Sequence, residues 1–102
     1  PTRNGRNAQI FTKHGTINLR NQKWNFDFSP LAPEGTSYVD SAYTKAYVHH
    51  LFKAQELLAM QIASIHNLAF YLWLVGEARQ HIIAGDFYVW KAKMVEELGR
   101  RL

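Results

Sequence analysis

The chain of 102 residues contains no cysteine. This absence excludes disulfide bonds and thiolate metal sites, and it fits a reducing compartment, so we expect a cytoplasmic protein. Proline and glycine are scarce, with 3 and 6 residues, and no glycine-rich phosphate loop is present. The hydrolase pattern G-x-S-x-G and the zinc-helix pattern H-E-x-x-H are missing as well. Taken residue by residue, the sequence shows no catalytic apparatus.

Acidic residues are absent from the first quarter of the chain, where none precedes Asp27. The same stretch carries five basic residues: Arg3, Arg6, Lys13, Arg20 and Lys23. Two interpretations remain open, a phosphate-bearing partner such as a nucleic acid or a solvated basic surface. Arg3 and Arg6 stand in a turn-prone segment rich in asparagine, and guanidinium groups suit both phosphates and the acceptor edge of guanine.

Hydrophobic residues make up 47% of the chain, enough for the core of one small domain. The longest apolar stretch, residues 57–75, is long enough to cross a membrane, but polar residues such as His66 and Asn67 occupy its centre. We therefore expect a buried helix of a soluble protein and no membrane partner. The chain starts without a charged and then apolar leader, so we expect no signal peptide and a start that belongs to a longer protein.

The order of local patterns predicts an α+β fold. Two strand-type runs, residues 8–12 and 16–20, flank a short link with Gly15 and predict a β-hairpin over residues 8–20. Residues 21–40 contain Pro30 and Pro33 and predict an irregular loop.

About three α-helices are expected in residues 41–102. Asp40 or Ser41 can cap the first of them, and the second runs from about residue 55 to 84 and is apolar nearly all round, so it should be covered on most sides. Gly85 fits a left-handed C-terminal cap, and Asp86 fits the N-cap of the last helix.

One spacing resembles a metal site whose ligands are missing. Positions 35, 37 and 40, followed by residue 66, follow the zinc pattern C-x-C-x-x-C…H, but they are occupied by Gly35, Ser37, Asp40 and His66. One imidazole, one carboxylate and a hydroxyl make a poor zinc site, because thiolates supply most of the affinity in such sites. We therefore expect no metal cofactor, a buried hydrogen-bonding role for His66, and a loop held by packing, with Pro30, Pro33, Tyr38 and Val39 as candidates.

Five separated blocks carry a resemblance to a known family: PTRNGRNAQIFT, GTINLRN, SPLAPE, YTKAYVHHLF and IHNLAFY. In this order and spacing they closely resemble the C-terminal part of bacterial tRNA-guanine transglycosylase, also called queuine tRNA-ribosyltransferase. The resemblance implies that residues 1–102 form a single C-terminal subdomain of a TIM-type (β/α)₈-barrel enzyme. That enzyme exchanges the wobble guanine of tRNA for a 7-deazaguanine base in queuosine biosynthesis, through a covalent bond from an aspartate to the ribose.

The resemblance also implies roles for particular residues. The nucleophilic aspartate falls four residues before Pro1 and the missing barrel binds the 7-deazaguanine base, so residues 1–102 are expected to be inactive alone. Within residues 1–7, the segment Thr2, Arg3, Asn4, Gly5 and Arg6 corresponds to a contact with the tRNA anticodon loop. The family's zinc cysteines fall on Gly35, Ser37 and Asp40 and its histidine on His66, so the zinc of the family is expected to be lost in this zinc-knuckle equivalent, residues 21–40.

Tyr43, Tyr47 and His50 correspond to the family's dimer interface, which implies a homodimer; aromatic enrichment at interfaces favours this over packing inside the subunit. Two alternatives stay open beside the enzyme fragment. One is a non-catalytic accessory or dimerisation module, and the other is a small free-standing RNA-binding domain that uses the basic residues of the first quarter.

Overall fold

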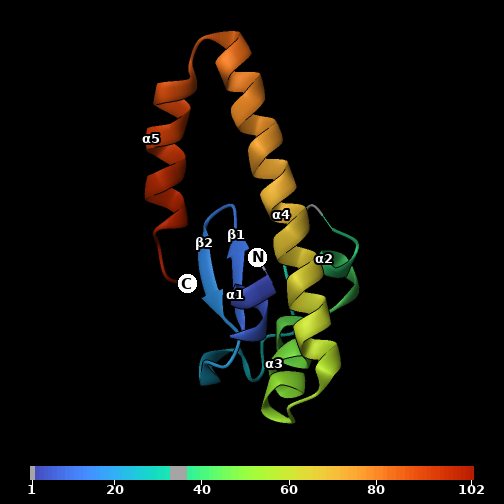
Figure 1. Cartoon of the computed structure of the whole chain (residues 1–102). Helices are drawn as coiled ribbons and strands as arrows, with labels where there is room; N and C mark the ends of the chain where they lie inside the picture. Colours follow the sequence, from blue (N-terminus) through green and yellow to red (C-terminus); the bar gives the residue numbers. More distant parts are fainter. Residues whose placement is uncertain (1, 33–36) are drawn as a thin grey trace.

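The computed structural model describes residues 2–32 and 37–102. Its elements are, in order, α1 (Thr2–Arg6), β1 (Gln9–Thr12), β2 (Gly15–Asn18), the 3-10 helix η1 (Gln22–Trp24), α2 (Val39–Ala42), α3 (Lys45–Lys53), α4 (Leu57–Ala84) and α5 (Phe87–Leu98). They form an elongated body of 46 × 22 × 21 Å. The small hairpin and the short helices gather at one end, and α4 and α5 extend together beyond them (Figure 1). The expected α+β class, with one hairpin and a helical remainder, is present.

The hairpin expected over residues 8–20 is present with shorter strands. β1 and β2 pair antiparallel, and the register places Ile10 opposite Ile17. Both isoleucines are buried and belong to the core, because alternate residues of each strand face the helices. Gly15 opens β2 at φ 152°, a backbone angle that glycine adopts without strain.

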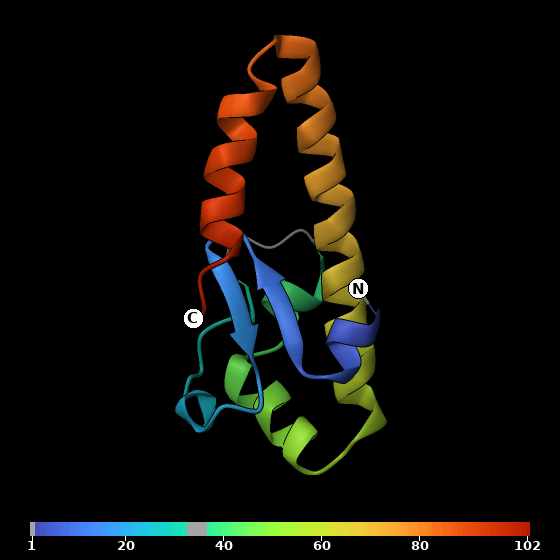
Figure 2. The same ribbon diagram turned by 60° about the vertical axis from the view of Figure 1, so that its left-hand side comes forward.

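Both outer edges of this two-stranded sheet are covered. The backbone N–H of Thr16 donates to the carbonyl of Arg100 at 2.8 Å, and that of Leu102 donates to the carbonyl of Thr16 at 2.9 Å, so the segment after α5 pairs with β2. On the other side, α4 runs along β1 (Figure 2). Covered edges leave no free strand for pairing with another chain.

The first predicted helix is divided in two. α2 ends at Ala42, Tyr43 is extended, and α3 begins at Lys45, with Thr44 as its N-cap. The Thr44 hydroxyl oxygen accepts from the backbone N–H of Tyr47 at 3.1 Å, which satisfies a first-turn donor. The prediction that Asp40 or Ser41 caps a helix starting at residue 41 was therefore wrong.

The end of α4 and the start of α5 both follow the prediction. Gly85 adopts φ 83° and caps α4 in the left-handed conformation. Asp86 occupies the N-cap position of α5, although its side chain makes no capping hydrogen bond in the described part of the chain. Its carboxylate instead accepts a hydrogen bond from Nδ1 of His81 at 2.8 Å, which ties the two helices at their turn.

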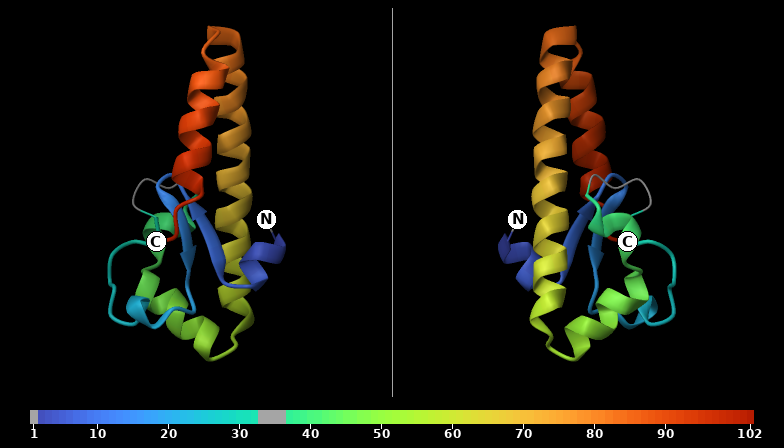
Figure 3. Two further views of the ribbon diagram at one scale, coloured as in Figure 1. Left: turned by 90° about the vertical axis from the view of Figure 1, so that its left-hand side faces the viewer. Right: turned by 90° about the vertical axis from the view of Figure 1, so that its right-hand side faces the viewer.

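The long helix α4 is covered on its first half only. Its residues Ala59, Ile62, Ala63 and Phe70 are buried, but Leu72 is exposed, and Ile83 near the turn is 79% exposed. α5 packs beside the second half (Figure 3), and Met94 is the buried residue of α5. The prediction that α4 is covered on most sides is thus not met within the described residues.

By length and composition alone, α4 is long and apolar enough to cross a membrane. One such helix is weak support for a membrane protein, because core helices of soluble proteins share these features. The polar residues in the middle of α4, His66 and Asn67, form hydrogen bonds to the backbone of the hairpin.

Candidate functional site

The basic N-terminal segment forms a short helix, where the sequence predicted a turn. In α1 the side chains of Arg3 and Arg6 are exposed. Residues three apart on a helix share a face, so the two guanidinium groups point to the same side. Asn4 is half-buried and its amide donates to Oε1 of Gln9 at 3.0 Å. Pro1 lies outside the described residues.

Gly5 sets the position of α1 on α4. It is buried, and a Cβ atom added to it would lie 2.7 Å from Oγ and 2.9 Å from the backbone N of Ser64. Only glycine permits so close an approach. After α1 the chain turns through Ala8, at φ 65° and fully buried, into β1. The C-terminal half of α1 is therefore packed closely on α4, and both arginines are exposed.

The residues of the zinc-like pattern are placed as follows. Gly35 lies outside the described residues, as does Pro33. Ser37, Asp40 and His66 lie together: His66 Nδ1 bonds to Oδ1 of Asp40, and the backbone N–H of Ser37 donates to Oδ2 of Asp40 at 3.1 Å. The predicted burial and hydrogen bonding of His66 are confirmed, since its side chain is 1% exposed.

The loop before α2 is held by the backbone of the segment that follows it. N–H groups of Leu31 and Ala32 donate to the carbonyls of Tyr43 and Asp40 at 2.9 and 3.2 Å. Val39 is buried as expected, but Tyr38 is exposed and does not hold the loop, and Pro30 is exposed too.

The donor set of this corner does not suit a metal ion. Within residues 2–32 and 37–102, no group of three or more His, Cys, Asp or Glu side chains lies close enough to hold one. The two family ligand positions that can coordinate, Asp40 and His66, are bonded to each other. The residues present therefore do not fit the zinc of the family pattern.

The three predicted interface residues, Tyr43, Tyr47 and His50, form an aromatic stripe that lies only partly on a helix. Tyr43 precedes α3, yet its ring stacks on that of Tyr47 with centroids 5.7 Å apart and 8° between planes. Tyr47 is 45% exposed and His50 is exposed, whereas Tyr43 packs against the core. One side of the stripe thus faces solvent.

Three buried polar residues were missed by the sequence prediction. Asn67 and His49 are fully buried, and Lys45 is nearly so. His49 Nδ1 donates to the carbonyl of Leu19 at 2.6 Å. The available signal was a polar residue on an otherwise apolar helical face, which marks a hydrogen bond to another element but not its partner.

Lys45 organises the loop between β2 and α2. Its ammonium group donates to Oγ of Ser29 at 3.0 Å and to the carbonyl of Pro30 at 2.8 Å. The Ser29 hydroxyl donates in turn to Asp27 and lowers the pKa of that carboxyl group; the Ser29 backbone N–H and the Lys45 charge act in the same direction, and partial burial opposes them.

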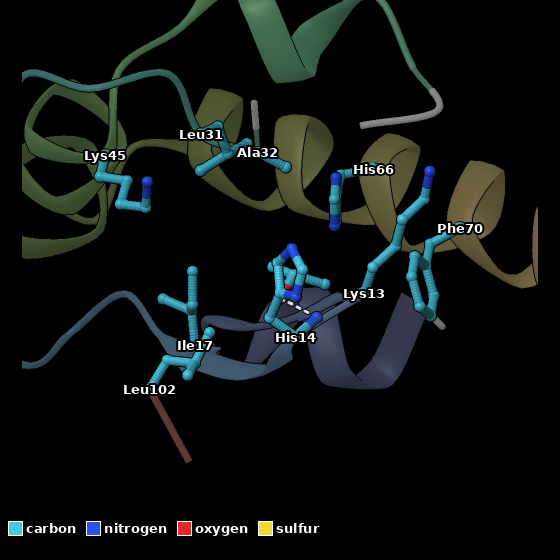
Figure 4. A pocket seen from close by; sticks show the side chains of 10 residues that line it. Lys13, His14, Ile17, Leu31, Ala32, Lys45, His66, Phe70 and Leu102 are labelled. Carbon is cyan, nitrogen blue, oxygen red and sulfur yellow. Dashed lines mark hydrogen bonds between the residues drawn. The ribbon is translucent and has the colours of Figure 1, made fainter. Parts of the chain in front are cut away.

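A cavity of about 230 Å³ lies beside His66, between the hairpin, the loop and α4 (Figure 4). Its basic lining groups are Lys13, His14 and Lys45. Apolar side chains such as Phe70 complete its wall.

Comparison with known proteins places this chain. The family model of queuine tRNA-ribosyltransferase matches residues 1–100. The chain belongs to the queuine tRNA-ribosyltransferase family. Among relatives of this name, the protein of Helicobacter acinonychis is 45% identical over 96 residues, which is 94% of this chain and 26% of that protein. The protein of Clostridium perfringens is 45% identical over 101 residues, 99% of this chain and 27% of that protein.

The queuine tRNA-ribosyltransferase of Helicobacter pylori strain 26695 is 43% identical over 101 residues, again 99% of this chain and 27% of the relative. The chain therefore spans about a quarter of the length of these relatives. It corresponds to a C-terminal part of the enzyme, as its motifs suggested.

Proposed function

We propose that the full-length protein is a tRNA-guanine transglycosylase, which exchanges the wobble guanine of tRNA for a 7-deazaguanine base. Residues 1–102 form its C-terminal subdomain, and a (β/α)₈ barrel outside this chain supplies the base pocket and the nucleophilic aspartate four residues before Pro1. Membership of the family supports this function. In this proposal residues 1–102 have no activity of their own.

The role proposed for this chain is a contact with the tRNA anticodon loop through residues 2–6. One observation supports it most directly: α1 exposes Arg3 and Arg6 on one side, while Gly5 fixes the helix to α4. Pre-positioned guanidinium groups lose less entropy on binding phosphate than flexible ones. Thr2 and Asn4 belong to the same segment.

The experiment replaces each arginine in the full-length protein. Arg3→Ala and Arg6→Ala are expected to raise the KM for tRNA about tenfold each, the loss of a charge-assisted hydrogen bond. The melting temperature should stay within about 1 °C, because both side chains are exposed. Guanine exchange into tRNA is assayed at fixed salt, since phosphate contacts weaken as salt rises.

Arg79→Ala is the matched control, because Arg79 is an exposed arginine on the far half of α4. It should leave the KM for tRNA unchanged. Unaltered kinetics in both α1 variants would refute the contact, and absence of guanine exchange by the unmodified full-length protein would refute the enzyme.

We also propose that Tyr43, Tyr47 and His50 belong to a homodimer interface. The stacked tyrosines, with Tyr47 and His50 open to solvent, support an aromatic contact. Tyr47→Ala should raise the dimer dissociation constant at least tenfold in sedimentation experiments. A dimer of unchanged affinity would place the interface elsewhere.

The alternative is a non-catalytic accessory module, which could also use the exposed Tyr47 and His50 for dimerisation. The residue four positions before Pro1 separates the two functions: aspartate supports the enzyme, and any other residue supports the accessory role. A free-standing RNA-binding domain predicts instead that residues 1–102 alone bind tRNA with a steep salt dependence.

A further inference from the structure

The corner between α2 and α4 contains a buried pair of ionisable side chains. Asp40 and His66 are 2% and 1% exposed, and they bond through Oδ1 and Nδ1. They occupy two of the four positions at which the family pattern places metal ligands. The other described position, Ser37, contributes its backbone N–H to Asp40 rather than a ligand atom.

Both ring nitrogens of His66 face oxygen atoms. Nδ1 meets the Asp40 carboxylate, and Nε2 meets the backbone carbonyl of Phe11 in β1. The ring lies in the interior, so each ring nitrogen of His66 has a protein oxygen as its partner. Asp40 is the one carboxylate bonded to the ring in the described residues.

Among the described residues that line the cavity next to the ring, the other titratable ones are basic: Lys13 and His14 from the hairpin and Lys45 from α3 (Figure 4). Lys45 donates to Ser29 and Pro30. The second oxygen of the Asp40 carboxylate accepts a hydrogen bond from the backbone N–H of Ser37.

The next residue of α4 extends the same attachment along β1. The backbone N–H of Phe11 donates to Oδ1 of Asn67 at 3.1 Å, and Nδ2 of Asn67 donates to the carbonyl of Gln9 at 2.8 Å. Together with His66, the helix thus satisfies three backbone groups on the outer edge of β1. Asp40 orients the ring that makes one of these bonds, so the corner, α4 and the hairpin are joined through one network.

We propose that the Asp40–His66 pair takes over the structural work of the family's metal, joining the residue 37–40 corner to α4 and β1 without any ion. Both ring nitrogens of His66 and both oxygens of Asp40 already contact protein groups, so neither side chain faces an open coordination position. A direct bond between two protein side chains thus stands where the family pattern places two metal ligands. The fold therefore holds without zinc and depends on the pairing of these two side chains.

The first test measures metal in the unmodified full-length protein, purified from zinc-supplemented cells. We expect less than about 0.1 zinc ion per chain and a melting temperature that EDTA does not change, because metal that binds only the native state would stabilise it. One zinc ion per chain, lost to EDTA together with stability, would overturn the proposal.

The second test removes the pair from the same protein. Asp40→Asn and His66→Gln should each lower the melting temperature by roughly 5–10 °C, because either change breaks a hydrogen bond between two fully buried polar side chains and leaves one of them without its partner. The double variant should lose clearly less than the sum of the two, since both single changes break one interaction. Additive losses, or no loss, would contradict the pairing. If a variant does not fold, the metal content and the EDTA response of the unmodified protein still decide.

The chain offers a matched control in its exposed Asp–His pair. Asp86 accepts from Nδ1 of His81 at 2.8 Å, but the two side chains are 54% and 28% exposed. Asp86→Asn should shift the melting temperature by less than about 2 °C, because exposed pairs contribute little. A shift as large as that of Asp40→Asn would show that burial does not distinguish the two pairs. None of these measurements depends on tRNA or on base exchange, so they remain valid if the proposed function fails.

Discussion

The two halves of α4 meet different surroundings within the described chain. The first half packs on α1, β1 and α3, and its inward residues, polar and apolar alike, are buried. The second half contacts α5, and most of its side chains are exposed, including large apolar ones such as Leu72 and Ile83. One continuous helix thus has a first half that is buried against other elements and a second half that is largely exposed.

The sequence of α4 explains this difference only in part. Its first half alternates small and polar residues at the contacts: Ala59 and Ala63 allow close approach, and His66 and Asn67 bond to β1. Its second half mixes polar residues such as Glu77 and Arg79 with large exposed apolar ones such as Leu72 and Ile83. Large exposed apolar patches often mark a surface that another part of a protein, or a partner, covers. This agrees with a chain that spans about a quarter of its relatives.

The largest expected contrast is between two isoleucines of α4. Ile62 is 2% exposed and belongs to the core, so Ile62→Ala should reduce the free energy of unfolding by about 3 kcal/mol, through lost burial and the cavity it leaves. Ile83 is 79% exposed, and Ile83→Ala should change it by less than about 0.5 kcal/mol. Urea unfolding of the 102-residue chain measures both.

The same two variants, made in the full-length protein, test whether the second half of α4 is exposed there as well. If the second half of α4 stays exposed there, Ile83→Ala remains neutral. A loss of more than about 1.5 kcal/mol would show that residues outside this chain cover it. Ile62→Ala should give the same loss in both settings.

Much of the fold could be predicted from the sequence because its signals are local. Strand-type residues around Gly15 predicted the hairpin, and Gly85 predicted the end of α4. The break between α2 and α3 was missed, since Tyr43 falls at helical spacing from Tyr47 and His50. The extended backbone at Tyr43 comes instead from its pairing with Leu31. Long-range backbone pairing of this kind produces no periodic pattern of hydrophobic residues from which it could be predicted.

The sequence indicated which residues belong to the candidate site, but not which hydrogen bonds they form. The resemblance singled out Asp40 and His66 as altered metal positions, and the burial of His66 followed from its place in an apolar helix. Their bond to each other, and the use of Asn67 against β1, depend on the docking of α4 on the hairpin, which the sequence does not specify. The helix at Thr2–Arg6 was missed because Asn4 and Gly5 have low helix propensity.

A smaller contrast is expected between two glycines that meet opposite surroundings. At Gly5 an added Cβ would lie 2.7 Å from Oγ and 2.9 Å from the backbone N of Ser64, so Gly5→Ala must push α1 away from α4. We expect a loss of about 1–2 kcal/mol in the free energy of unfolding, because the backbone of α4 cannot yield as a side chain can. Ser64→Gly would remove the hydroxyl but leave the backbone nitrogen, so it should restore only part of the loss.

Gly76, in the second half of α4, is the control for Gly5→Ala and gives the smallest effect. Nothing lies within 4 Å of the Cβ that alanine would add there. Gly76→Ala should therefore stabilise the chain by about 0.5–1 kcal/mol, the helix propensity that glycine forgoes in a helix interior. A gain in the 102-residue chain that turns into a loss in the full-length protein would place a neighbouring backbone against Gly76. Such a reversal would mean that another segment of the full-length protein packs closely against the second half of α4, as α1 packs against the first half at Gly5.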